Sequence, residues 1–161
     1  MQPSILGTRL VHWRDEAACA ASAAALAGHA ALADAFVELH GPLGAGKTTF
    51  ARHLLAALGV AGRVKSPTYT LMEPYQSDAA HGGFAIAHFD FYRFDDAQEW
   101  EDAGFREVFA EPGLKLVEWP EKAEALLPRC DLRLTITPDD ASPARELRIE
   151  ALSARGEELL R

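Results

Sequence analysis

The sequence predicts an α/β fold with a largely parallel central sheet, and three observations support this. Short apolar runs typical of buried strands alternate along the chain with segments whose apolar residues recur at helical spacing. A glycine-rich loop joins one apolar run directly to one helical segment. The chain has 161 residues, 48% of them hydrophobic and 25% charged, which suits a globular domain with one core.

The first third of the chain predicts a strand, a helix, a second strand and a second helix. A short strand is expected around 9–12, followed by a helix over about 16–31. Asp15 is placed to cap that helix, because its carboxylate can accept hydrogen bonds from free N–H groups of the first turn. The apolar run AFVELH at 35–40 indicates a buried strand, and the helical spacing of 47–58 indicates the second helix.

The remainder of the chain predicts strands separated by short helices and turns. Gly104 breaks the helical pattern of 97–109 into one or two short helices, and 120–127 forms another. The segment 77–83 is a turn or a small exposed loop. Further strands are expected at 68–75, 84–92, 114–119, 131–138 and 144–152, with the last two as candidates for an antiparallel pair.

Composition excludes several classes of protein. The net charge of −8 makes tight binding to a nucleic-acid backbone unfavourable, so RNA is expected to be contacted only indirectly. Cys19 and Cys130 lack the spacing of a zinc site or a disulfide framework. No export signal is visible, and the alanine-rich segment 17–33 is too short for a membrane span. We expect a cytoplasmic protein with one domain over 1–161, of which 152–161 is a loose tail.

The glycine-rich loop carries the strongest chemical signal. Residues 41–48 match G-x-x-x-x-G-K-[ST] between a predicted strand and a predicted helix, as a P-loop requires. Glycines let main-chain N–H groups point at phosphate oxygens, and the helix N-terminus adds partial positive charge. Lys47 is expected to reach the β- and γ-phosphates, and the Thr48 hydroxyl to join the Mg²⁺ shell. The residues expected to bind the nucleotide are Gly41, Gly44, Ala45, Gly46, Lys47, Thr48 and Thr49.

The loop therefore predicts a nucleoside triphosphate-binding protein with the three-layer sandwich of P-loop NTPases. Such a site needs an acid near the metal, at the carboxyl end of a neighbouring strand. Asp90 and Glu118 both end apolar runs, so the pattern alone leaves the choice open. His88, Asp90 and Tyr92 share one strand face. The hydroxyls of KSPTYTL at 65–71 form either a γ-phosphate-sensing switch segment or a capping turn.

The segments GPLGAGKTTF, VKSPTYTL, HFDFYRF and LVEWPEK, in this order and spacing, resemble the bacterial TsaE family. These are small P-loop ATPases of tRNA threonylcarbamoyladenosine (t6A) biosynthesis, and the likeness spans roughly Arg9 to Ile149. The resemblance implies ATP and Mg²⁺ as cofactors, with Glu118 a magnesium ligand beside Thr48 and Asp90 associated with hydrolysis. Lys47, Asp90 and Glu118 are then the expected catalytic residues. Pro42 stands where the family often has an acid, which bears on loop stiffness alone.

The resemblance also implies two protein partners. One is the subunit that performs the transfer to adenosine 37 of tRNAs reading ANN codons, and the other is its non-catalytic paralogue. Hydrolysis would drive or reset this complex and be slow in isolation, since Arg93 and Arg106 are the only central candidates for an arginine finger. Arg14–Glu16 and Arg145 are candidate neighbours of the base or ribose.

Three alternatives remain from the residues alone. A small-molecule kinase would use the same loop, although no arginine cluster between 90 and 127 is present to clamp an acceptor. A GTP-dependent switch would need an Asn/Thr-Lys-x-Asp tetrapeptide, which the sequence lacks. A nucleotide-bound scaffold without essential hydrolysis would share every motif.

Overall fold

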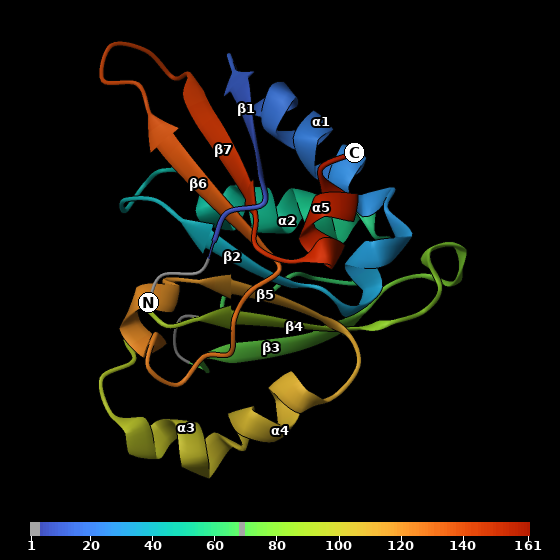
Figure 1. The fold of residues 1–161 in the computed structure, drawn as a ribbon, viewed down its shortest axis with the longest axis vertical. Helices are drawn as coiled ribbons and strands as arrows, with labels where there is room; N and C mark the ends of the chain where they lie inside the picture. The colour runs from blue at the N-terminus through green and yellow to red at the C-terminus, as the bar shows by residue number, and fades with distance from the viewer. Residues whose placement is uncertain (1–3, 68–69) are drawn as a thin grey trace.

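The computed structural model describes residues 4–67 and 70–161. In this part of the chain one seven-stranded sheet runs in the order β1-β7-β6-β2-β5-β4-β3 (Figure 1). The four strands β6, β2, β5 and β4 are parallel, whereas β7, β1 and β3 add antiparallel pairs at the two sides. This confirms the predicted fold class and the antiparallel last pair. The strands are β1 (Gly7–Trp13), β2 (Phe36–His40), β3 (Met72–Gln76), β4 (Ala85–Asp90), β5 (Leu114–Glu118), β6 (Leu132–Pro138) and β7 (Arg145–Ala151).

Helices cover both faces of the sheet. Figure 1 shows α2 behind the sheet, α1 beside β1, and α3 and α4 below β3. Leucines and alanines of α1 and α2 join the apolar residues of β2, β5 and β6 in one core. On the other face, Phe89 of β4 stacks on Phe109 at a centroid distance of 4.9 Å and meets Phe105 edge to face at 5.1 Å. The helices are α1 (Glu16–Ala27), α2 (Lys47–Ala57), α3 (Ala97–Ala103), α4 (Phe105–Ala110) and α5 (Ala154–Leu159), with 3₁₀ turns η1 (Ala30–Asp34), η2 (Ala79–His81) and η3 (Pro120–Ala123).

The parallel register brings the carboxyl ends of the central strands to one edge. Leu39 of β2 and Asp90 of β4 are both paired with Glu118 of β5. The segments that follow these three strands therefore leave the sheet side by side, where α/β proteins usually bind ligands. The glycine-rich loop after β2 and both candidate acids lie at this edge.

Most element boundaries agree with the sequence to within a few residues. Asp15 caps α1 as predicted, because its carboxylate accepts a hydrogen bond from the Ala18 N–H at 3.0 Å. Gly104 adopts φ 70° and separates α3 from α4, as predicted. The first helix ends at Ala27 rather than near residue 31, because Gly28 caps it and a 3₁₀ turn follows. In the segment 120–127, predicted as a helix, Pro120–Ala123 form the 3₁₀ turn η3, and the start of the predicted strand 68–75 lies outside the described residues.

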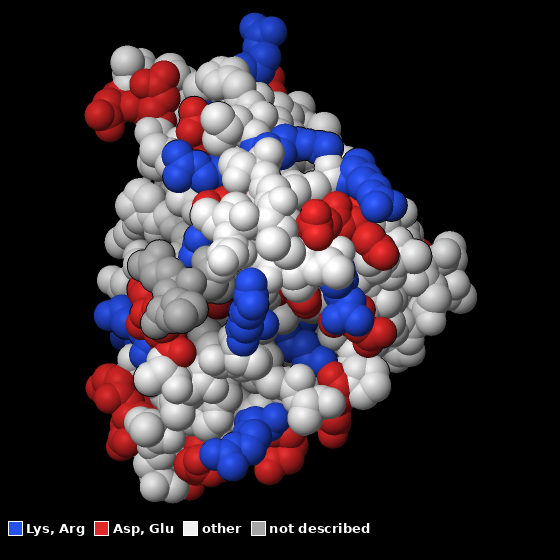
Figure 2. Space-filling model, viewed as in Figure 1, with Lys and Arg blue, Asp and Glu red and all other residues white. Residues whose placement is uncertain are grey.

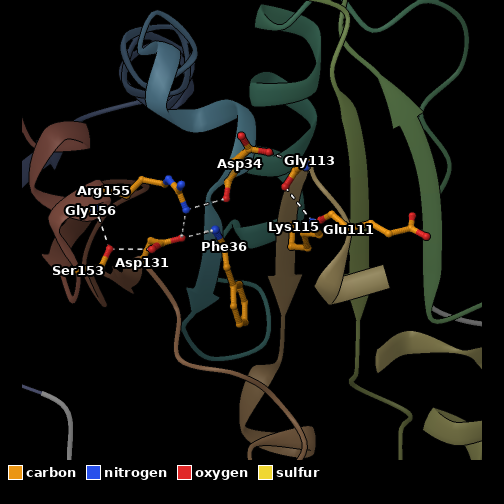
Figure 3. Close-up of polar contacts among 9 residues, drawn as sticks. All are labelled: Asp34, Phe36, Glu111, Gly113, Lys115, Asp131, Ser153, Arg155 and Gly156. Carbon is orange, nitrogen blue, oxygen red and sulfur yellow. Dashed lines mark hydrogen bonds and ion pairs between the residues drawn. The ribbon is translucent and has the colours of Figure 1, made fainter. Parts of the chain in front are cut away.

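The prediction of a loose tail over 152–161 is wrong. This segment contains α5, and its Leu152 and Leu159 side chains are buried. Ser153 fixes the start of the helix: its Oγ donates to Asp131 Oδ1 at 2.7 Å and accepts from the Gly156 N–H at 3.0 Å (Figure 3). A short helix with one turn of apolar contacts gives only a weak periodic signal, which is why the sequence pattern did not reveal it.

The surface mixes charges of both signs. On the face shown in Figure 2, Lys and Arg side chains are interspersed with Asp and Glu side chains. Within the described ranges, none of the helices combines the length and apolar character needed to cross a bilayer.

Candidate functional site

The loop that joins β2 to α2 depends on glycine at two positions. Gly41 has φ 146°, and a Cβ there would lie 2.6 Å from the Ile136 carbonyl oxygen, so no other residue fits without a shift. Gly46 has φ 109° and caps α2, whose first regular hydrogen bond runs from the Phe50 N–H to the Gly46 carbonyl. The backbone therefore wraps at the amino end of α2, as predicted for a phosphate-binding loop.

A cleft of about 420 Å³ lies over this loop. Leu43, Tyr92, Arg93 and Trp119 complete its wall. Gly41 does not line the cleft itself, but its carbonyl accepts a hydrogen bond from Lys47 Nζ, which does. The structure thus brings the residues predicted from sequence into one place; those that line the cleft are Gly44, Ala45, Gly46, Lys47, Thr48, Thr49, Asp90 and Glu118.

Glu118 is the centre of a buried chain of side chains. Thr48 Oγ1 donates to Glu118 Oε1 at 2.7 Å, and His88 Nε2 lies 2.7 Å from Glu118 Oε2. Glu118 and His88 are each only 1% exposed. A hydroxyl and a carboxylate oxygen are ligands that suit Mg²⁺, which usually takes one or two protein oxygens beside phosphates and waters. The residues present therefore fit such an ion.

Lys47 is folded back onto its own loop. Its Nζ donates to the Gly41 carbonyl and lies 3.3 Å from the centroid of the Trp119 ring, a cation–π contact. Burial lowers the pKa of Lys47, and the carboxylates of Glu121, Glu118 and Asp90 partly oppose this shift. The ammonium group thus has few hydrogen-bond partners and lies at the floor of a cleft that could admit an anion.

Asp90 lies on the cleft wall in register with Glu118. Its Oδ1 accepts a hydrogen bond from the Tyr92 N–H at 2.9 Å, which shapes the turn after β4. The two acids therefore differ in their contacts, since Glu118 bonds to the loop threonine and Asp90 to the main chain of its own turn. In the predicted switch segment, Thr68 lies outside the described residues, and Thr70 Oγ1 donates to Glu73 at 3.1 Å.

A second cavity of about 310 Å³ adjoins the loop on its other side. It is lined by Trp13, Cys19 and Pro143 and by the loop residues Ala45, Gly46 and Thr49. Arg145 lines it as well and donates from Nε to the Ala45 carbonyl at 3.1 Å. Of the segment 14–16, Asp15 and Glu16 contribute to the lining.

Sequence reasoning missed three features of this region. It left the roles of His88 and Trp119 undecided, although Trp119 lies against Lys47. It also gave no role to Trp13. A signal existed for Trp119, because it directly follows a strand-end acid and precedes Pro120. Its φ of 56° then turns the ring back over the lysine.

The strand, glycine loop and helix, with a lysine, a threonine and a neighbouring strand-end acid around one cleft, define a protein of the P-loop nucleotide-binding class. A family model described as "Threonylcarbamoyl adenosine biosynthesis protein TsaE" matches residues 13–147. This chain belongs to the TsaE family, and the resemblance stated from its motifs is confirmed.

Individual relatives agree with this assignment. A Haemophilus influenzae protein named tRNA threonylcarbamoyladenosine biosynthesis protein TsaE is 41% identical over 124 residues, covering 77% of this chain and 75% of the relative. A Bacillus subtilis protein of the same name is 40% identical over 100 residues, covering 62% and 60%. The crystal structure of Bacillus subtilis YdiB superposes with a TM-score of 0.74 at 27% identity, covering 98% of this chain and 94% of that one.

Proposed function

We propose that this chain is a Mg²⁺-dependent ATPase that works as one cytoplasmic domain in the complex forming threonylcarbamoyladenosine at position 37 of tRNAs reading ANN codons. Hydrolysis would drive or reset that complex. The observation that carries the ATPase proposal is the 2.7 Å contact between Thr48 and Glu118, next to Lys47 and at the mouth of the glycine loop. Family membership supports the role in t6A formation.

The chemistry follows from the cleft. Main-chain N–H groups of 44–48 would bind the phosphates, and Lys47 would leave the Gly41 carbonyl and the Trp119 ring for the β- and γ-phosphate oxygens. Thr48 and Glu118 would hold Mg²⁺, which neutralises charge on the phosphate oxygens when bound. Asp90 would orient a water for in-line attack on the γ-phosphorus, so that the bond to the bridging oxygen breaks and ADP and phosphate leave.

The second cavity is the proposed site of the base and ribose. It is continuous with the loop through Ala45, Gly46 and Thr49, and Trp13 supplies a flat apolar wall. Burial, and to a lesser extent the Glu16 carboxylate, raises the pKa of Cys19 to about 11, so its thiol remains neutral near pH 7. A largely apolar cavity beside a phosphate loop suits a purine ring.

Partner proteins are expected to complete the site. Among the described residues that line the cleft, Arg93 is the one arginine, and efficient P-loop hydrolysis usually needs an arginine finger in cis or from a partner. The net charge of −8 and the interspersed charges in Figure 2 favour contact with proteins over direct binding of tRNA.

The test is phosphate release from ATP and from GTP by the chain alone and with the transferase subunit and its paralogue. We expect slow, Mg²⁺-dependent hydrolysis of ATP alone and faster hydrolysis with the partners. A preference for GTP, phosphate transfer to a small acceptor that outpaces hydrolysis, or turnover by the isolated chain at the rate of a metabolic enzyme would contradict the proposal. An Asp90→Asn variant separates the ATPase from a scaffold without essential hydrolysis. If the chain were only a scaffold, this variant would bind nucleotide normally and still restore t6A formation in cells.

A further inference from the structure

Among the described residues, His88 has one polar contact, which is with Glu118. The residue lies in β4, two positions before Asp90, and its side chain reaches across to β5. Its Nε2 is 2.7 Å from Glu118 Oε2, and both side chains are removed from solvent. The other ring nitrogen, Nδ1, is buried and has no hydrogen-bond partner in the described part of the chain.

We propose that His88 is a positioning residue that orients the Glu118 carboxylate for the divalent metal ion of the nucleotide complex. An ionised carboxylate can only accept hydrogen bonds, so His88 Nε2 is the donor. With Oε2 held by His88, Oε1 is fixed on the side of Thr48 and the cleft. This inference rests on the proposed ATPase function, and it adds a residue that touches neither nucleotide nor metal.

The contact pattern distinguishes this role from a purely structural one. Buried polar side chains that serve stability normally satisfy all their polar atoms, often through the main chain. In the described part of the chain, His88 Nδ1 instead has no partner. Its Nε2 bonds to Glu118, the side chain that also bonds to the loop threonine. Hydrogen-bond partners that hold a metal ligand in place typically change metal affinity 10–100-fold when removed.

Three substitutions of His88 separate the effect of side-chain length from the effect of the hydrogen-bond donor. His88→Gln places an amide nitrogen about as far from the backbone as Nε2 and keeps the donor. His88→Asn carries the same amide too close to the backbone to reach Glu118. His88→Met matches glutamine in length and has no donor. The control is His81→Asn, because His81 also bonds to a carboxylate, Asp78 Oδ1 at 2.6 Å, but Asp78, unlike Glu118, does not line the cleft.

The readout is binding rather than turnover. Mn²⁺ affinity is measured by electron paramagnetic resonance with a non-hydrolysable ATP analogue present, and affinity for the analogue is measured separately in EDTA. We expect His88→Asn and His88→Met to weaken Mn²⁺ binding about 10–100-fold, with analogue affinity in EDTA unchanged. His88→Gln and His81→Asn should retain the wild-type Mn²⁺ affinity. Thermal melts establish that each variant folds. If His88→Asn does not fold, the comparison of His88→Gln with His88→Met decides whether the donor is needed.

Two results would overturn the inference about His88 without affecting the proposed function. One is a wild-type Mn²⁺ affinity in His88→Met, and the other is a loss of metal-free analogue binding as large as the loss of Mn²⁺ binding, which would mark a structural role. If the wild-type protein bound no Mn²⁺ with the analogue, the proposed function itself would fail, and the inference with it.

Discussion

Two polar clusters lie at opposite edges of the same sheet, and they use similar residues for different purposes. We call Asp34, Lys115, Asp131, Ser153 and Arg155 the amino-end cluster, because it lies where β2, β5 and β6 begin (Figure 3). The carboxyl-end cluster is Lys47, Thr48, His88, Asp90 and Glu118. Each contains a buried lysine and at least two carboxylates.

In the amino-end cluster the side chains bond largely to the main chain. Lys115 Nζ donates to the carbonyls of Glu111 and Gly113, and Asp34 Oδ1 accepts from the Gly113 N–H at 2.9 Å. Asp131 Oδ2 accepts from the Phe36 N–H at 2.8 Å. These bonds tie the starts of three strands together, and the Ser153 bond to Asp131 adds α5.

In the carboxyl-end cluster Thr48, Glu118 and His88 bond to one another, and the cluster members other than His88 line a cleft. Burial lowers the pKa of Lys47 and of Lys115 alike, so a lowered pKa does not separate a site from a structural cluster. The run of three bonded side chains beside a cleft does separate them. Bonds to the main chain fix the fold, whereas the Thr48–Glu118–His88 chain beside a cavity is arranged for a ligand. Disabling one cluster at a time tests this distinction.

The largest effect is expected from Lys47→Ala. Removal of the ammonium group takes away the charge that would stabilise the γ-phosphate, so hydrolysis should fall by at least about 10²-fold. The fold should persist, because in the described part of the chain the ammonium group bonds to its own loop and lies over the Trp119 ring. Steady-state phosphate release and a thermal melt measure both. Lys115→Ala is the matched control, and wild-type turnover in Lys47→Ala would defeat the distinction.

Glu118→Gln should have the next largest effect on activity. The substitution keeps the shape but removes the charge proposed to bind Mg²⁺, so the Mg²⁺ concentration for half-maximal turnover should rise about 10–100-fold. Nucleotide affinity in EDTA should change little. A Mg²⁺ titration of ATP hydrolysis measures the shift, and an unchanged midpoint would count against Glu118 as a ligand.

Asp131→Ala should affect stability instead. It leaves the Phe36 N–H and the Ser153 hydroxyl without their acceptor, which costs about 1–3 kcal/mol. Urea unfolding followed by circular dichroism should show this loss, while ATP turnover per folded molecule stays at the wild-type level. A loss of turnover without a loss of stability would show that the two edges are not separable.

The smallest effect concerns the pH dependence of stability. Burial holds the pKa of Lys115 below its ordinary value of 10.5, so between the two values the unfolded chain binds more protons than the folded one. The free energy of unfolding should therefore rise with pH through this window. Lys115→Met should flatten part of that rise, and Lys47 accounts for a further part. Urea unfolding at about pH 8 and about pH 10 compares the slopes; an unchanged slope in Lys115→Met would contradict this assignment.

Most of the fold and the glycine-rich loop could be predicted from the sequence, because glycine spacing and apolar runs are local signals. The pattern could not choose between Asp90 and Glu118, since both end apolar strands and lie in register, and the difference is which carboxylate bonds to Thr48. The His88–Glu118 bond joins residues 30 positions apart and is likewise set by register. The bond from Ser153 to Asp131, which anchors α5, spans 22 positions and has no periodic signature.

The most direct measurement is a crystal structure with a non-hydrolysable ATP analogue and Mg²⁺. We expect polyphosphate oxygens within hydrogen-bond distance of the main-chain N–H groups of 44–48 and of Lys47 Nζ. We also expect a metal ion within about 2.0–2.3 Å of Thr48 Oγ1 and of a Glu118 oxygen. A nucleotide bound elsewhere would contradict this prediction. So would a metal ion in the loop that Glu118 does not coordinate.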